Sequence, residues 1–230
     1  MADTIRLGVF ASGGGTNFQS IIDNCEAGRI DARVEVLITN REDAGSLVRA
    51  ANHGIESHVV PVGKDLSDDF HAADERHVEI LRDCNVDLVC LAGYMRRIGS
   101  GVLNAFPHAV LNIHPAILPS FKGAHGQRDA VEYGARVSGA TVHFADEEFD
   151  RGPIVIQAAV PVVPGDTEDS LAARILQQEH RIYPQAIQWF AEGRMRVEGR
   201  TVVLDPPSRG RYEGQGPAVI ISPPLEFEEA

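Results

Sequence analysis

Residues 6–17 read Arg6-Leu7-Gly8-Val9-Phe10-Ala11-Ser12-Gly13-Gly14-Gly15-Thr16-Asn17, an apolar run followed by three glycines and two polar residues. The apolar run has the composition of a strand buried on both faces, and an amphipathic segment that predicts a helix follows it. Glycines at such a turn leave backbone N–H groups and the helix N-terminus open to a phosphate. A tight turn that needs glycine only for its geometry is the alternative. The loop is neither a Walker A motif nor GxGxxG, because no Lys-Ser/Thr follows and Phe18 stands where the third glycine would be.

Outward from this turn, short apolar runs alternate with amphipathic segments. The predicted strands are Arg6 to Ala11, Val34 to Thr39, His58 to Val62, Leu88 to Leu91 and Val110 to Ile113, and the predicted helices between them are Phe18 to Ala27, Asp43 to His53 and Asp69 to Cys84. This alternation predicts a parallel sheet with helical crossovers.

The second half of the chain changes character. Ala140 to Phe144 and Ile154 to Val163 predict strands without a helix between them, which favours an antiparallel extension of the sheet. A long helix, Glu168 to about Phe190, follows, and Pro184 is expected to kink or interrupt it. We therefore predict an α/β fold with a Rossmann-like open sheet, mainly parallel in its N-terminal half, and helices on both faces.

Composition excludes several classes of protein. The 230 residues carry a formal net charge of −12, which argues against a general nucleic-acid or anionic-membrane surface. The chain has three cysteines, Cys25, Cys84 and Cys90, which is an odd number and includes no CxxC spacing. We therefore expect buried thiols in a reducing compartment rather than a zinc site or a disulfide scaffold. The N-terminus lacks a signal peptide's apolar region, and no apolar run approaches the roughly 20 residues of a membrane span. We expect a cytoplasmic protein.

A second motif, Leu111-Asn112-Ile113-His114-Pro115-Ala116-Ile117-Leu118-Pro119, lies at the carboxyl end of the fifth predicted strand. Ligands bind at that edge of an open α/β sheet, and residues two apart face the same side of a strand. Asn112 can donate to an oxyanion, and His114 can do so or move a proton near neutral pH. A structural histidine is the alternative. The Leu118-Pro119 bond is a candidate cis peptide.

A third motif, Gly139 to Pro153, contains the carboxylates Asp146, Glu147, Glu148 and Asp150. Such a run is typical of a solvated loop. One carboxylate beside an imidazole would hold its tautomer and favour its protonated form, and Asp150 lies where the chain must turn inward to begin a strand. The residues alone do not choose among the four.

Together these segments resemble the glycinamide ribonucleotide formyltransferases, from about Arg6 to about Gly193. Leu91 to Arg96 and Gln178 to Pro184 also resemble this family at the expected places. The family transfers a formyl group from 10-formyltetrahydrofolate to the primary amine of glycinamide ribonucleotide in purine synthesis. The resemblance therefore implies this reaction, with small-molecule substrates, no nucleic-acid or membrane partner, no metal and no covalent enzyme intermediate, in a monomer or homodimer.

The resemblance also implies roles for individual residues. The catalytic residues would be Asn112, His114 and Asp150, with Asp150 keeping His114 charged. The phosphate of glycinamide ribonucleotide would bind Gly15, Thr16 and Asn17, and Glu179 would contact the rest of that substrate. The folate would contact Leu91, Met95, Arg96, Arg97, Ile98, Val110, Asn112, His143, Ala145 and Asp146. Two departures from the family are Phe70, where an arginine or lysine is usual, and Ala116, where a serine is usual.

In these terms we predict one catalytic domain over residues 1–204. Its phosphate-binding half covers about 1–105 and its folate and catalytic half about 106–204. Residues 205–230 form a tail rich in proline and glycine, expected to be an extended or mobile arm.

Three other functions are alternatives. Formyltetrahydrofolate deformylase shares the Asn-x-His and Asp elements, but that family carries a regulatory domain for which there is no room ahead of Arg6, and a hydrolase needs no phosphate loop. Methionyl-tRNA formyltransferase would need a further C-terminal domain and a basic surface. A folate- or nucleotide-binding relative without turnover is the third alternative, prompted by Phe70 and Ala116.

Overall fold

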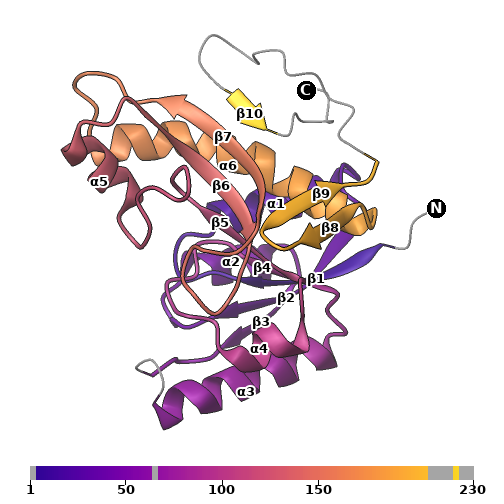
Figure 1. Cartoon of the computed structure of the whole chain (residues 1–230). Coiled ribbons are helices and arrows are strands. Elements are labelled where there is room, and N and C mark those ends of the chain that lie inside the picture. The colour runs from indigo at the N-terminus through magenta and orange to yellow at the C-terminus, as the bar shows by residue number, and fades with distance from the viewer. Residues whose placement is uncertain (1–3, 64–66, 207–219, 223–230) are drawn as a thin grey trace. The chain divides into compact units, whose positions relative to one another are not determined.

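The computed structural model describes residues 4–63, 67–206 and 220–222 (Figure 1). Contacts between Cα atoms divide the chain into two compact units. The first consists of Met1–Asn112 with Ala145–Glu147, and the second of Ile113–Phe144 with Glu148–Ala230. This division does not test whether residues 1–204 form one catalytic domain, which stays a prediction.

The first unit alternates strands and helices. Its elements are β1 (Ile5–Phe10), α1 (Thr16–Glu26), β2 (Ala32–Thr39), α2 (Gly45–Asn52), β3 (Glu56–Val59), α3 (Asp68–Asp83), β4 (Leu88–Leu91), α4 (Ser100–Ala105) and β5 (Val110–His114), whose last two residues belong to the second unit. The strands pair in parallel in the order β3-β2-β1-β4-β5. The predicted parallel sheet with helical crossovers is confirmed.

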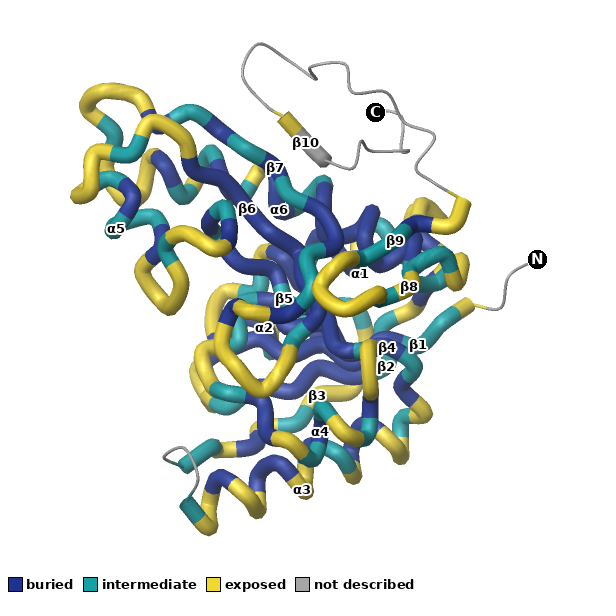
Figure 2. Tube along the Cα trace, viewed as in Figure 1, coloured by how far each residue is buried: buried dark blue, intermediate teal, exposed yellow. Residues whose placement is uncertain are grey.

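Helices cover both faces of this parallel sheet. On one face, Phe10, Val36 and Ile38 join α3 residues such as Ile80 and Leu81 in one apolar cluster. The alternate strand residues, Leu37 among them, point to the opposite face, where α1 and α2 contact β2 and each other. Figure 2 shows β4 and the later residues of β1 and β2 as buried. Strands buried on both faces explain why their sequences are continuously apolar rather than alternating.

His77 of α3 is a buried histidine in this core. It is 2% exposed, and its ring makes edge contacts with the rings of Phe10 and Tyr94. Its Nε2 has no hydrogen-bond partner among the described residues. Burial lowers the pKa of His77 from 6.5 to about 4, because the apolar surroundings disfavour the charged ring.

We expect acid to destabilise the protein through His77. The pKa is depressed only in the folded state, so between pH 6.5 and 4 the unfolded chain binds a proton that the folded chain excludes. The free energy of unfolding should therefore fall by up to about 3 kcal/mol as the pH drops through this window. Urea unfolding of wild type and His77→Phe at several pH values measures the contribution, which the variant should lack. Identical pH dependence in both proteins would contradict it.

The second unit contains an antiparallel pair and one long helix. Its remaining elements are α5 (Gly126–Tyr133), β6 (Val137–Phe144), β7 (Ile154–Pro161), α6 (Glu168–Ala191), β8 (Met195–Glu198), β9 (Thr201–Leu204) and β10 (Ile220–Ser222). β6 and β7 pair antiparallel, as predicted. β9 runs parallel to β7 through one residue pair, and β8 pairs antiparallel with β9.

Helix α6 begins with a capping box and runs past a proline. The Thr167 side chain accepts a hydrogen bond from the Ser170 N–H, and the Ser170 hydroxyl accepts one from the Thr167 N–H. The helix continues through Pro184 to Ala191, so an interruption at Pro184 is ruled out, and a kink there stays a prediction. Residues on both sides of the proline, Tyr183 and Trp189 among them, are buried, and their packing offsets the lost backbone hydrogen bond.

The predicted tail lies mostly outside the described residues. The part that the structure describes includes β10, which pairs antiparallel with Gln157–Ala159 of β7. Strands β8 and β9, just before the tail, were not predicted. Among the helices described, none combines the length and the hydropathy of a segment that crosses a bilayer.

Candidate active site

Two histidines and one aspartate form a buried cluster in the second unit. His114 ends β5, His143 lies near the end of β6, and Asp150 lies in the turn that precedes β7. Asp150 Oδ1 is 3.5 Å from His114 Nδ1 and 3.8 Å from His143 Nε2. Two of the predicted catalytic residues, His114 and Asp150, are thus neighbours. His143, which the resemblance assigned to the folate site, lies beside them.

The loop that follows β5 holds both His114 and Asp150. The carbonyl oxygen of Phe121 lies 2.9 Å from His114 Nε2, and the N–H of Gly123 donates to Asp150 Oδ2 at 2.9 Å. Asp150 itself has φ of 52°, in the left-handed region that aspartate and asparagine tolerate better than most residues. The Leu118–Pro119 bond in this loop is cis, as predicted.

The protonation states of this cluster follow from burial and from its partners. Burial lowers the pKa of His114 and outweighs the Asp150 carboxylate and the Phe121 carbonyl, which raise it. Asp150 thus acts on the pKa of His114 in the predicted direction, and its role in keeping His114 charged stays a prediction. Burial raises the pKa of Asp150, but the neighbouring rings of His143 and His114 and the hydrogen bond from the Gly123 N–H together hold it below its usual value. Burial therefore favours the neutral form of His114, while the groups around Asp150 favour its ionised form.

The geometry also determines where His114 takes up a proton. A carbonyl oxygen only accepts hydrogen bonds, so Nε2, which faces Phe121, carries the proton of the neutral ring. Nδ1 is then the basic atom, and it faces the Asp150 carboxylate. A proton added at Nδ1 gives an imidazolium with an oxygen acceptor at each nitrogen. The cluster can therefore accept a proton and stabilise the resulting cation.

The glycine loop lies in the first unit, between β1 and α1. Gly15 has φ of 72° and caps α1 without a side-chain hydrogen bond, so a left-handed residue begins the helix. A Cβ placed on Gly13 or Gly14 would meet no atom within 4 Å. Thr16 and Asn17 form the first turn of α1, two residues before the predicted start. The loop is therefore open beside a helix N-terminus, as a phosphate site requires.

Ser12 connects this loop to the segment that follows β4. Its hydroxyl donates to Asn40 Oδ1 at 2.5 Å and accepts from the N–H of Met95 at 2.8 Å, and its own N–H donates to the Gly93 carbonyl at 3.1 Å. Ser12 and Asn40 were missed at the sequence level. Their position directly after two neighbouring parallel strands was the available signal.

The predicted folate contacts of the first unit come from three stretches of chain. Leu91 ends β4, Val110 begins β5, and the carbonyl of Val110 accepts from the N–H of Ala145 at 2.8 Å. Arg97 Nη2 donates to the Glu147 carbonyl at 2.6 Å, which joins the segment Met95 to Ile98 to the acidic turn. Arg96 and Asp146 are exposed beside these contacts.

The other predicted residues lie on defined elements. Asn112 is partly buried on β5, two residues before His114, so both side chains leave the same side of the strand. Glu179 is 6% exposed on α6. Phe70, the departure from the family on α3, is 4% exposed and belongs to the core, and Ala116 is fully buried.

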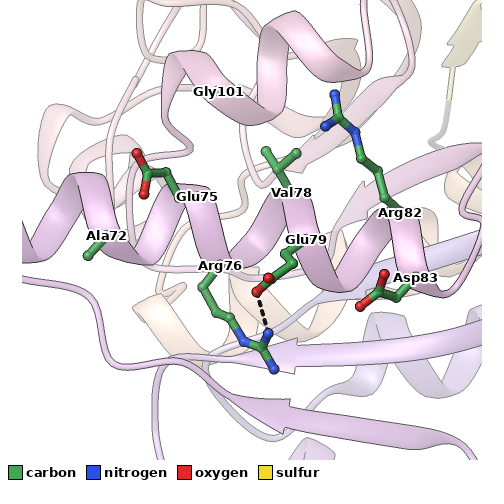
Figure 3. A pocket seen from close by; sticks show the side chains of 8 residues that line it. All are labelled: Ala72, Glu75, Arg76, Val78, Glu79, Arg82, Asp83 and Gly101. Carbon is green, nitrogen blue, oxygen red and sulfur yellow. Dashed lines mark hydrogen bonds and ion pairs between the residues drawn. The ribbon is translucent and has the colours of Figure 1, made fainter.

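A cavity of about 720 Å³ lies on the surface of α3 (Figure 3). It is lined by Ala72, Glu75, Arg76, Val78, Glu79, Arg82, Asp83 and Gly101, and it contains none of the predicted site residues. The Arg76–Glu79 ion pair spans one turn of the helix there. Within the described ranges, no three His, Cys, Asp or Glu side chains are grouped as a metal site.

Comparison with known proteins identifies the family of the chain. The family described as formyl transferase matches residues 5–187. The chain belongs to the formyl transferase family. It is 38% identical over 204 residues to phosphoribosylglycinamide formyltransferase of Escherichia coli (strain K12), covering 87% of this chain and 94% of that protein. The corresponding enzyme of Haemophilus influenzae is 40% identical over 200 residues, covering 87% and 93%.

Solved structures of the family resemble this formyl transferase closely. Glycinamide ribonucleotide transformylase 1 from Symbiobacterium toebii superposes with a TM-score of 0.85 at 50% identity, covering 89% of this chain and 95% of that one. A formyltetrahydrofolate deformylase from Pseudomonas syringae superposes with a TM-score of 0.80 at 27% identity, covering 88% of this chain and 66% of that one. The predicted α/β fold is thereby confirmed.

Proposed function

We propose that this formyl transferase transfers the formyl group of 10-formyltetrahydrofolate to the amine of N1-(5-phospho-D-ribosyl)glycinamide. The products are formylglycinamide ribonucleotide and tetrahydrofolate, in de novo purine synthesis. The observation that carries the proposal is the buried pair of His114 and Asp150 in a chain that also has an open glycine loop at a helix N-terminus. Relatives at about 40% identity over most of the chain are named for this activity.

Each substrate has matching groups in the chain. The phosphate of glycinamide ribonucleotide would bind at Gly15, Thr16 and Asn17, and Glu179 would contact its sugar or glycinamide part. The folate's pterin would bind along Met95 to Ile98 and the turn Ala145 to Glu147, which the Arg97 hydrogen bond joins. Main-chain N–H and C=O groups of such segments suit the donors and acceptors of a pterin edge.

The chemistry requires an oxyanion site and a proton acceptor. The substrate amine attacks the formyl carbon, a C–N bond forms, and the carbonyl oxygen becomes negative. Asn112 would donate its amide N–H to that oxygen. His114 would take a proton as the amine loses one, and its imidazolium would be stabilised by Asp150. The bond from the formyl carbon to N10 of the folate then breaks, and N10 recovers the proton.

Mixing the protein with 10-formyltetrahydrofolate, first alone and then with glycinamide ribonucleotide, tests this function. We expect tetrahydrofolate to appear only when the amine acceptor is present, with one formylated nucleotide formed for each folate consumed. Rapid release of formate without the acceptor would instead establish a deformylase. Tight binding of both substrates without any product would establish a non-catalytic relative.

We further propose that the enzyme acts in the cytoplasm, as a monomer or homodimer, on these small molecules only. The net charge of −12 supports the lack of a nucleic-acid or anionic-membrane partner, because polyanions are repelled. Cys25, Cys84 and Cys90 form no disulfide, which agrees with a reducing compartment.

A further inference from the structure

Arg49 of α2 forms a hydrogen bond to the glycine loop. Its Nε donates to the carbonyl of Gly14 at 2.7 Å, and its Nη1 donates to Gln19 Oε1 at 3.0 Å. A Cβ on Gly15 would come within 3.4 Å of Arg49 Cδ. The guanidinium thus lies against both the loop and the first turns of α1.

Within the described part of the chain, the charge of Arg49 has no carboxylate counter-ion. Several other arginines in this acidic chain pair with carboxylates, as Arg6 does with Asp87 and Arg174 with Asp166. Arg49 has two neutral acceptors, and among the described residues no carboxylate pairs with it and nothing accepts from its Nη2. A fixed cation with spare donors is the arrangement that binds a phosphate, because guanidinium N–H groups match phosphate oxygens.

Ser46, also on α2, gives a second and independent sign of a ligand. Its side chain is fully buried, and a Cβ on Gly15 would lie 2.9 Å from Ser46 Cβ. The Ser46 hydroxyl has no hydrogen-bond partner among the described residues. Buried polar groups are nearly always satisfied, so an unsatisfied hydroxyl against the loop indicates that the loop is completed by something else.

We infer that Arg49 is the cationic contact for the phosphate monoester of glycinamide ribonucleotide. It fixes the Gly14 carbonyl with Nε and presents its remaining N–H groups to the phosphate oxygens. This inference rests on the proposed function, because the phosphate belongs to that substrate. It adds a charge to a site that otherwise consists of backbone N–H groups and the Thr16 and Asn17 side chains. In a chain of net negative charge, such a local cation favours the binding of an anionic ligand.

Steady-state kinetics of Arg49→Met and Arg49→Lys at two salt concentrations test the inference. Removing the charge in Arg49→Met should raise KM for glycinamide ribonucleotide about 10- to 100-fold, the effect of losing charge-assisted hydrogen bonds. The kcat should stay within about 3-fold, since Arg49 does not contact the reacting carbonyl. Arg49→Lys keeps the charge without the planar fork and should restore part of the affinity.

The salt dependence separates a phosphate contact from a structural role. Between about 50 and about 500 mM salt, wild-type KM should rise steeply, and in Arg49→Met it should rise less, because an attraction that salt screens is missing. A variant that merely loosened the loop would keep the wild-type salt dependence. Arg82→Met makes the same change of net charge on the exposed side of α3 and should behave as wild type.

The outcomes are distinguishable. An unchanged KM in Arg49→Met would overturn the inference, as would a raised KM with wild-type salt dependence and no rescue by lysine. Either result leaves the proposed function standing, provided that wild type forms formylated nucleotide. If wild type forms none with both substrates present, the proposed function itself fails.

Discussion

Replacing His114 by alanine is expected to lower turnover at least about 100-fold, the usual loss for an acid-base or oxyanion group. The variant removes the basic Nδ1 that faces Asp150, so the proton of the attacking amine loses its acceptor. Binding of glycinamide ribonucleotide, measured by calorimetry, should stay close to wild type, since its phosphate is bound elsewhere. Single-turnover formyl transfer measures the chemical step itself.

His58→Ala is the matched control for this prediction. His58 lies on β3, where it pairs with Glu56 and takes no part in either proposed substrate site. Its turnover should equal that of wild type. If His114→Ala retained wild-type turnover, His114 would have no chemical role, and the catalytic proposal would need another proton acceptor.

The largest expected effect on stability comes from Gly139→Ala on β6. Gly139 is paired with Ala159 of β7, and a Cβ at Gly139 would lie 1.9 Å from the carbonyl oxygen of Ala158. No side-chain rotation relieves a collision with backbone, so the two strands must separate. We expect the variant to lose at least about 3 kcal/mol of unfolding free energy or to fail to fold in soluble form. Chemical unfolding and the soluble yield measure this.

Ser138→Ala tests the same strand without the collision. Ser138 is 1% exposed, and its hydroxyl has no partner among the described residues, so its removal should cost less than about 0.5 kcal/mol. A Gly139→Ala protein as stable as Ser138→Ala would show that β6 and β7 are not packed as the structure has them.

The sequence predicted the elements whose signals are local. Strands β4 and β5 and the later residues of β1 and β2 are largely buried, so their apolar runs stand out, and β4 matches its predicted bounds residue for residue. Helix α5 and strands β8 and β9 are short and partly exposed, and their composition does not differ from that of loops. An interruption of α6 at Pro184 was wrongly predicted. Whether a proline ends a helix depends on how well the surrounding turns are buried, and the local sequence does not show this.

For the site, side-chain type and strand-end position located Asn112 and His114, while the choice of Asp150 among four carboxylates came from family resemblance. The contacts of Asp150 explain that choice, because its carboxylate lies beside two histidines and a backbone N–H. The sequence could indicate that a carboxylate raises the pKa of His114, but it could not indicate the burial that lowers it. Arg49 was not singled out from the sequence, because a sequence does not show which arginines have carboxylate partners.

The pairing of β10 with β7 has a consequence for how copies of the chain meet. A bare strand edge offers unpaired main-chain groups on which another molecule can add a strand, and this is a route to aggregation. Residues Gln157–Ala159 of β7 have these groups paired with β10 of the same chain. While β10 is paired there, another molecule cannot add a strand directly to that part of β7.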